Sequence, residues 1–83
     1  MTMMKAKINL TNYNNHKMGW TETATNLFFD ENKVHFDTVL TTLGDIVTRE
    51  FEQVESIKDY GNSIYIYARN TLNNDKYRIV IYK

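Results

Sequence analysis

Two runs near the carboxyl end decide the fold: Gly61-Asn62-Ser63-Ile64-Tyr65-Ile66-Tyr67-Ala68-Arg69 and Tyr77-Arg78-Ile79-Val80-Ile81-Tyr82. Both are rich in β-branched and aromatic residues, and the asparagines between them favour a turn. The pattern predicts a β-hairpin in which Arg69 faces Lys76. This register gives a core face of Ile64, Ile66, Ala68, Tyr77, Ile79 and Ile81, and an opposite face of Tyr65, Tyr67, Arg69, Arg78, Val80 and Tyr82.

The amino-terminal half also contains strand patterns. Apolar and polar residues alternate from Met4 to Leu10, which is typical of a half-buried strand, and residues 12–19 have the composition of a loop. For residues 20–36 we favour a second hairpin that turns at residues 30–33. A short helix capped by Thr21 is the alternative, although three β-branched threonines argue against it.

The strongest helical pattern lies between Asp37 and Glu50. Asp37 is a good N-cap, and apolar residues recur at helical spacing at Val39, Leu40, Leu43, Ile46 and Val47. Residues 51–58 are expected to form a weakly amphipathic edge strand that leads into the carboxyl-terminal hairpin. The sequence therefore predicts a single α+β domain over residues 1–83. An antiparallel sheet, made of an amino-terminal strand and hairpin and a carboxyl-terminal three-stranded meander, packs against one main helix at about 38–50.

Composition narrows the class of protein. The chain has 83 residues and no cysteine, and we find neither a signal peptide nor a membrane span in it, so we expect a small soluble protein in the cytoplasm of a host cell. Net charge is zero, yet nine of the ten acidic residues fall between Glu22 and Asp59, where three basic residues oppose them. We therefore expect a molecule with an acidic layer and a more basic sheet.

No group of residues predicts catalysis. The two histidines, His16 and His35, have no neighbours at the spacing of a metal site or a catalytic pair. The aspartates and glutamates that lie close together in the sequence lack a partner nucleophile, and we interpret them as part of a turn and of a solvated face. We expect a protein that is not an enzyme and has no cofactor and no metal.

The first candidate binding surface is the outer face of the carboxyl-terminal hairpin. Tyrosine and arginine are enriched in protein interfaces, and on an open sheet they also stack bases and neutralise phosphates. A second layer that covers the rings, or ordinary cross-strand pairing, would explain the same pattern without a ligand. The candidate residues are Tyr65, Tyr67, Arg69, Arg78 and Tyr82.

The second candidate surface is acidic and comprises Asp45, Glu50, Glu52, Glu55 and Asp59. Ordered carboxylates on a small rigid body suit a basic groove that evolved for nucleic acid. In size and composition the chain resembles small phage and plasmid proteins. The leading hypothesis is therefore a phage or mobile-element inhibitor, of the anti-defence or anti-CRISPR kind, that docks on a larger protein or ribonucleoprotein complex that processes nucleic acid. A single-stranded nucleic-acid binder and a homodimer or other structural oligomer that pairs through an edge strand are the alternatives; no membrane partner is expected.

Overall fold

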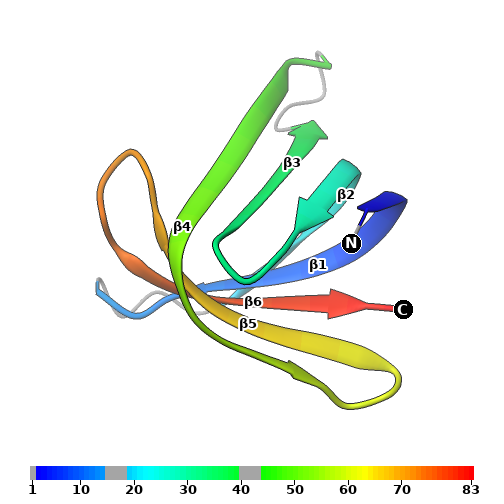
Figure 1. Ribbon diagram of the computed structural model, residues 1–83. Helices are drawn as coiled ribbons and strands as arrows, with labels where there is room; N and C mark the ends of the chain where they lie inside the picture. The colour runs from blue at the N-terminus through cyan, green and yellow to red at the C-terminus, as the bar shows by residue number, and fades with distance from the viewer. Residues whose placement is uncertain (1, 15–18, 40–43) are drawn as a thin grey trace.

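Six antiparallel strands form a closed barrel in the computed structural model, which describes residues 2–14, 19–39 and 44–83 (Figure 1). Each strand pairs with the next one along the chain, and β6 pairs with β1 to close the ring. The strands are β1 (Thr2–Asn12), β2 (Trp20–Phe29), β3 (Lys33–Val39), β4 (Ile46–Asp59), β5 (Ser63–Asn70) and β6 (Lys76–Tyr82).

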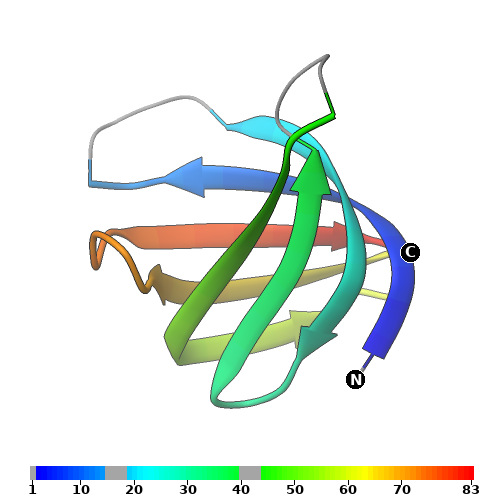
Figure 2. The same ribbon diagram turned by 90° about the horizontal axis from the view of Figure 1, so that it is seen from above.

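The barrel closes because its long strands bend. In Figure 1, β4 sweeps across the whole molecule, and its first half pairs with β3 while its second half pairs mainly with β5. The register of β4 shifts at Gln53, which has a φ of 53°, and the register of β2 shifts at Asn26, with a φ of 52°. Such bulges increase local twist and bend a strand. Figure 2 shows β1 and β2 curving around the barrel between β6 and β3.

The core fills the inside of the barrel. Alternate residues of the strands point inward, and Ile8, Leu10, Ile66 and Ile79 are fully buried there. Phe51 links two sides of the core, since its ring centroid lies 5.2 Å from the ring centroid of Tyr77 and 6.2 Å from that of Phe36.

The predicted hairpins are confirmed. In the carboxyl-terminal hairpin Arg69 faces Lys76 and Tyr67 faces Arg78, which is the register inferred from the sequence. Residues 20–29 form a strand rather than a helix, and they pair with β3 after a turn at residues 30–32. The carboxylate of Asp30 stabilises this turn by accepting hydrogen bonds from the backbone amides of Asn32 and Lys33. These hydrogen bonds lower the pKa of Asp30.

The predicted helix at 38–50, and with it the α+β class, is wrong. Residues 38–39 end β3, residues 46–50 begin β4, and residues 40–43 lie outside the described part of the chain. The strands pair directly, with Thr38 opposite Val47 and Val39 opposite Ile46. Two residues of the supposed apolar stripe are exposed, Val39 at 58% and Ile46 at 71%. β-Branched residues occupy much of this segment, and cross-strand pairing outweighed its apolar spacing.

The predicted edge strand at residues 51–58 is also wrong. This segment belongs to β4, which has a neighbour on each side. Its charged side chains point to solvent because one side of every strand in a barrel faces outward, and no exposed ladder has to be protected. Within residues 2–14, 19–39 and 44–83, no helix has the length and apolar character needed to cross a membrane.

Candidate binding surfaces outside and at the mouth of the barrel

Tyrosine rings gather on the outside of β5 and β6. Tyr65 and Tyr67 project from β5, and residues in the adjoining turns extend the group in both directions. The ring of Tyr13 lies parallel to that of Tyr67 with centroids 6.3 Å apart, and the ring of Tyr60 meets that of Tyr65 edge-on at 5.1 Å. We call this surface the tyrosine–arginine face; it consists of Tyr13, Tyr60, Tyr65, Tyr67, Arg69, Arg78 and Tyr82.

Arg78 lies at the centre of this face. Its guanidinium carbon is 5.8 Å from the centroid of the Tyr65 ring, within the range of a cation–π contact. Its Nη2 donates to Thr11 at 3.4 Å, and its buried Nε has no hydrogen-bond partner among the described residues. Arg69 instead donates to the backbone carbonyl of Asn74 at 2.9 Å, which holds it at the turn.

No second layer of the described chain covers the tyrosine–arginine face. Tyr60 is 60% exposed, Tyr82 is 44% and Tyr13 is 41%, while Tyr65 and Tyr67 are half-buried. Val80 lies on the same side of the hairpin but is buried among its neighbours, so the face has a small apolar centre. Of the predicted site residues, Tyr65, Tyr67, Arg78 and Tyr82 lie on this face together, and Arg69 lies at its turn end.

Tyr13 and Tyr60 were missed at the sequence level. Both lie in turns, where the alternation of polar and apolar residues does not indicate the direction in which a side chain points. The signal that was present is their position: each is an aromatic residue beside turn-forming asparagine, aspartate or glycine, next to a strand of the predicted sheet.

Four of the five predicted acidic residues are spread along β4, and the group is partly neutralised. Glu55 pairs with Lys76 at 3.0 Å and Asp59 with Lys83 at 2.8 Å, and the bond from Lys83 lowers the pKa of Asp59. Glu52 stands between Lys33 on β3 and Arg69 on β5. Glu50 is exposed opposite His35, and Asp45 is exposed before β4 begins.

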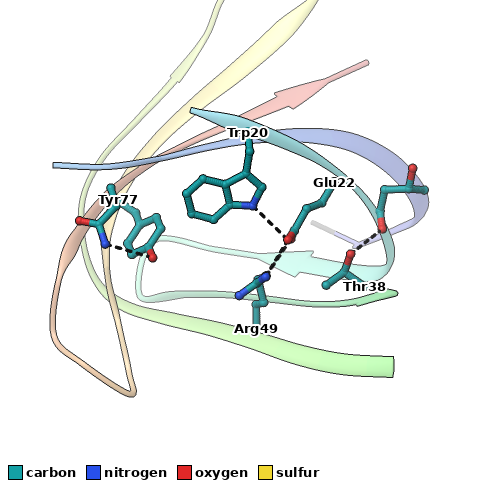
Figure 3. A network of polar contacts seen from close by, with 7 residues as sticks. Trp20, Glu22, Thr38, Arg49 and Tyr77 are labelled. Atoms are coloured by element: carbon teal, nitrogen blue, oxygen red, sulfur yellow. Dashed lines mark hydrogen bonds and ion pairs between the residues drawn. The ribbon is translucent and has the colours of Figure 1, made fainter. Parts of the chain in front are cut away.

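A second polar group lies inside one end of the barrel (Figure 3). Glu22 points inward from β2 and Arg49 from β4, and they form a two-point ion pair with N–O distances of 2.7 and 2.6 Å. Trp20 donates its indole N–H to the same carboxylate at 3.1 Å. The side chain of Glu22 is only 9% exposed and that of Arg49 is 21% exposed.

This ion pair borders an open hollow of about 880 Å³, which we call the barrel-mouth hollow. It lies where β2 continues beyond the last residue that pairs with β3, and the Thr38 hydroxyl donates to the carbonyl of Thr23 at 3.2 Å across this gap. Trp20, Glu22, Arg49, Lys5, Val39 and four threonines line it. The sequence did not predict this site because Arg49 falls within the predicted helix but outside its apolar stripe, whereas strand alternation with Val47 and Phe51 turns it inward.

Neither histidine extends these surfaces. His35 stacks on Phe28 on the outside of the β2–β3 pair, with ring centroids 5.2 Å apart, and His16 lies outside the described residues. The described residues contain no cluster of three or more potential metal ligands of the histidine, aspartate or glutamate type.

Comparison of the chain with protein-family models, with curated proteins and with solved structures finds no match. Interpretation of the two surfaces therefore depends on their own geometry.

Proposed function

We propose that this chain is a non-catalytic binding protein, an inhibitor that docks on a larger nucleic-acid-processing complex through protein–protein contacts made by its tyrosine–arginine face. The observation that carries the proposal is the arrangement of that face. Tyrosine rings and the Arg78 guanidinium form its centre, and ion pairs lie around it. Protein interfaces have this arrangement, with aromatic and arginine residues in the middle and charged residues at the rim.

Charge also favours a protein partner. Two rows of paired residues cross the centre of the face, and neither contains a carboxylate. One row is Lys58, Tyr65 and Val80, and the other is Ser56, Tyr67 and Arg78. At the margins, Lys76 and Lys83 already bind the carboxylates of Glu55 and Asp59. A surface that follows a phosphate backbone needs many unneutralised cations, and the net charge of this chain is zero.

The acidic surface carries less of the proposal than the sequence suggested. Two of its five carboxylates are ion-paired and a third lies between two cations. Steering by the remaining acids would affect the rate of association more than the strength of the complex.

The test is a comparison of baits in lysate of the native host. Tyr67→Ala and Arg78→Ala remove the centre of the face, whereas Glu31→Gln changes an exposed residue in the turn between β2 and β3 and serves as the control. We expect a partner that is retained by the wild type and by Glu31→Gln and lost with both face variants, since central anchors cost about 2 kcal/mol or more when truncated. The proposal fails if no partner is retained, or if the face variants retain it equally.

Single-stranded nucleic acid is the second candidate, and one observation favours it. The cation–π pair of Arg78 and Tyr65 lies beside Lys58 and within one strand of Lys7, and no ion pair to either lysine is present among the described residues. Fluorescence anisotropy with labelled 20-nucleotide DNA and RNA decides it. Binding that weakens steeply with salt and with Tyr67→Ala would replace the protein-docking proposal.

A further inference from the structure

The barrel-mouth hollow has the size, the position and the lining of a small-molecule site. Its volume of about 880 Å³ is within the range of small-molecule sites, and the mouth of a β-barrel is a common position for them. A tryptophan and a charged pair lie on its wall. A well-packed apolar pair of similar size generally stabilises a fold as well as a buried ion pair does, so the charges at this position call for another explanation.

The Arg49–Glu22 pair has a spare donor and little spare acceptor capacity. The Glu22 carboxylate already accepts three hydrogen bonds, two from Arg49 and one from Trp20. Arg49 uses Nε and Nη2 for this pair, and no hydrogen bond joins its Nη1 to a described residue. Lys5 lies at the rim of the hollow, where its exposed side chain shares the outer face of β1 with Lys7, opposite Thr25. A free guanidinium edge beside a largely satisfied carboxylate favours a ligand that accepts hydrogen bonds, and an anion most of all.

We propose that the barrel-mouth hollow binds a small organic anion. Carboxylate or phosphate oxygens of the ligand accept hydrogen bonds from the free edge of the Arg49 guanidinium, and the Lys5 ammonium at the rim attracts the anion without bonding to it. An aromatic or apolar body of the ligand contacts Trp20. Glu22 occupies the other edge of the guanidinium with its two-point bond, and its negative charge works against an anion at the free edge.

Trp20 makes this proposal directly testable, because it is the one tryptophan of the chain and lies at the site. The probes are benzoate and phenyl phosphate, and benzyl alcohol is the neutral control of similar size. The readouts are the NMR shift of the indole N–H and the fluorescence of Trp20. We expect a saturable shift with at least one anion and none with the alcohol; a response to only one anion identifies the class of oxyanion.

Variants separate a binding role from a structural one. Lys5→Gln alters an exposed side chain and should weaken anion binding about two- to fivefold. Glu22→Gln removes the competing negative charge and should strengthen anion binding, whereas Lys58→Gln, opposite Tyr65 on the outside of the barrel, should leave it unchanged. Arg49→Gln should weaken it about tenfold or more in protein whose NMR spectrum shows the native fold.

The proposal is overturned if neither anion gives a saturable shift in the wild type. It is also overturned if benzyl alcohol binds as well as the anions, or if Lys5→Gln and Glu22→Gln both leave the affinity unchanged.

Discussion

The ion pair inside the barrel gives the sharpest prediction. Replacing Arg49 with methionine keeps most of the volume of the side chain but leaves the Glu22 carboxylate with one hydrogen-bond donor, Trp20, in place of three. The Glu22 side chain is 9% exposed, so water only partly replaces the lost partner. We expect Arg49→Met to be strongly destabilising, because a buried charge without its partner bears the full cost of its desolvation.

The magnitude follows from the burial of the pair. Breaking a fully buried ion pair from one side costs about 3–5 kcal/mol, and the open hollow beside Arg49 reduces this to about 2–3 kcal/mol. A domain of this size has a free energy of unfolding of about 4–12 kcal/mol. Such a loss lowers the melting temperature by about 10–20 °C.

A double-mutant cycle separates the pair from its packing. Glu22→Gln combined with Arg49→Met removes both charges while leaving an oxygen acceptor for Trp20, so it should recover at least half of the stability lost in Arg49→Met. Urea unfolding, followed by circular dichroism and by Trp20 fluorescence, measures the stability of Glu22→Gln, of Arg49→Met and of the double variant. Lys83→Met, which breaks an exposed pair with Asp59, is the control and should have little effect. If Arg49→Met is no more destabilising than Lys83→Met, or if the double variant is as unstable as Arg49→Met, the reasoning is refuted.

Three further predictions concern the core, a bulge and pH. Phe51→Ala should cost about 3–5 kcal/mol in urea unfolding because its ring is 1% exposed and contacts two other rings; a loss below about 1 kcal/mol would contradict the core described above. Gln53→Asn should raise stability by about 0.5–1 kcal/mol, since asparagine tolerates the left-handed φ of 53° better; a decrease would indicate a role for the glutamine side chain. The pKa of Asp59 is lowered from 3.8, mainly by its hydrogen bond from Lys83, so its stabilising contribution is complete above that pH and is lost as pH falls below it. Asp59→Asn should therefore flatten the loss of stability in acid, and an unchanged acid titration of the unfolding midpoint would count against the pair.

Much of the strand pattern was readable from the sequence. Alternation of Ile64, Ile66 and Ala68 with tyrosines, followed by Tyr77, Ile79 and Ile81, set both the hairpin and its register, because a one-residue slip would move every apolar side chain to the outside. The part of the tyrosine–arginine face that lies on β5 and β6 followed from the same parity. Its exposure did not, because exposure depends on whether another layer lies over that side of the sheet.

The segment from Asp37 to Glu50 shows where local patterns fail. Val39, Ile46 and Val47 satisfy helical spacing, yet they also fit two strands that pair across a turn. When a pattern fits both the helical and the strand period, the available pairing partners decide the structure. β4 pairs with β3 on one side and with β5 on the other. The same error hid the site at the barrel mouth. A helix at this position gives no reason to expect that Arg49 contacts Glu22, which is 27 residues away in the chain.

The sequence by itself therefore determined which side of each hairpin is apolar, and with it the grouping of tyrosine and arginine on one outer face. Only the tertiary structure decided that the sheet closes on itself, leaving that face open and bringing Glu22 and Arg49 together at the barrel mouth. The physical reason is range: alternation is a property of neighbouring residues, whereas closure depends on bulges and on the pairing of β1 with β6, about 70 residues apart along the chain.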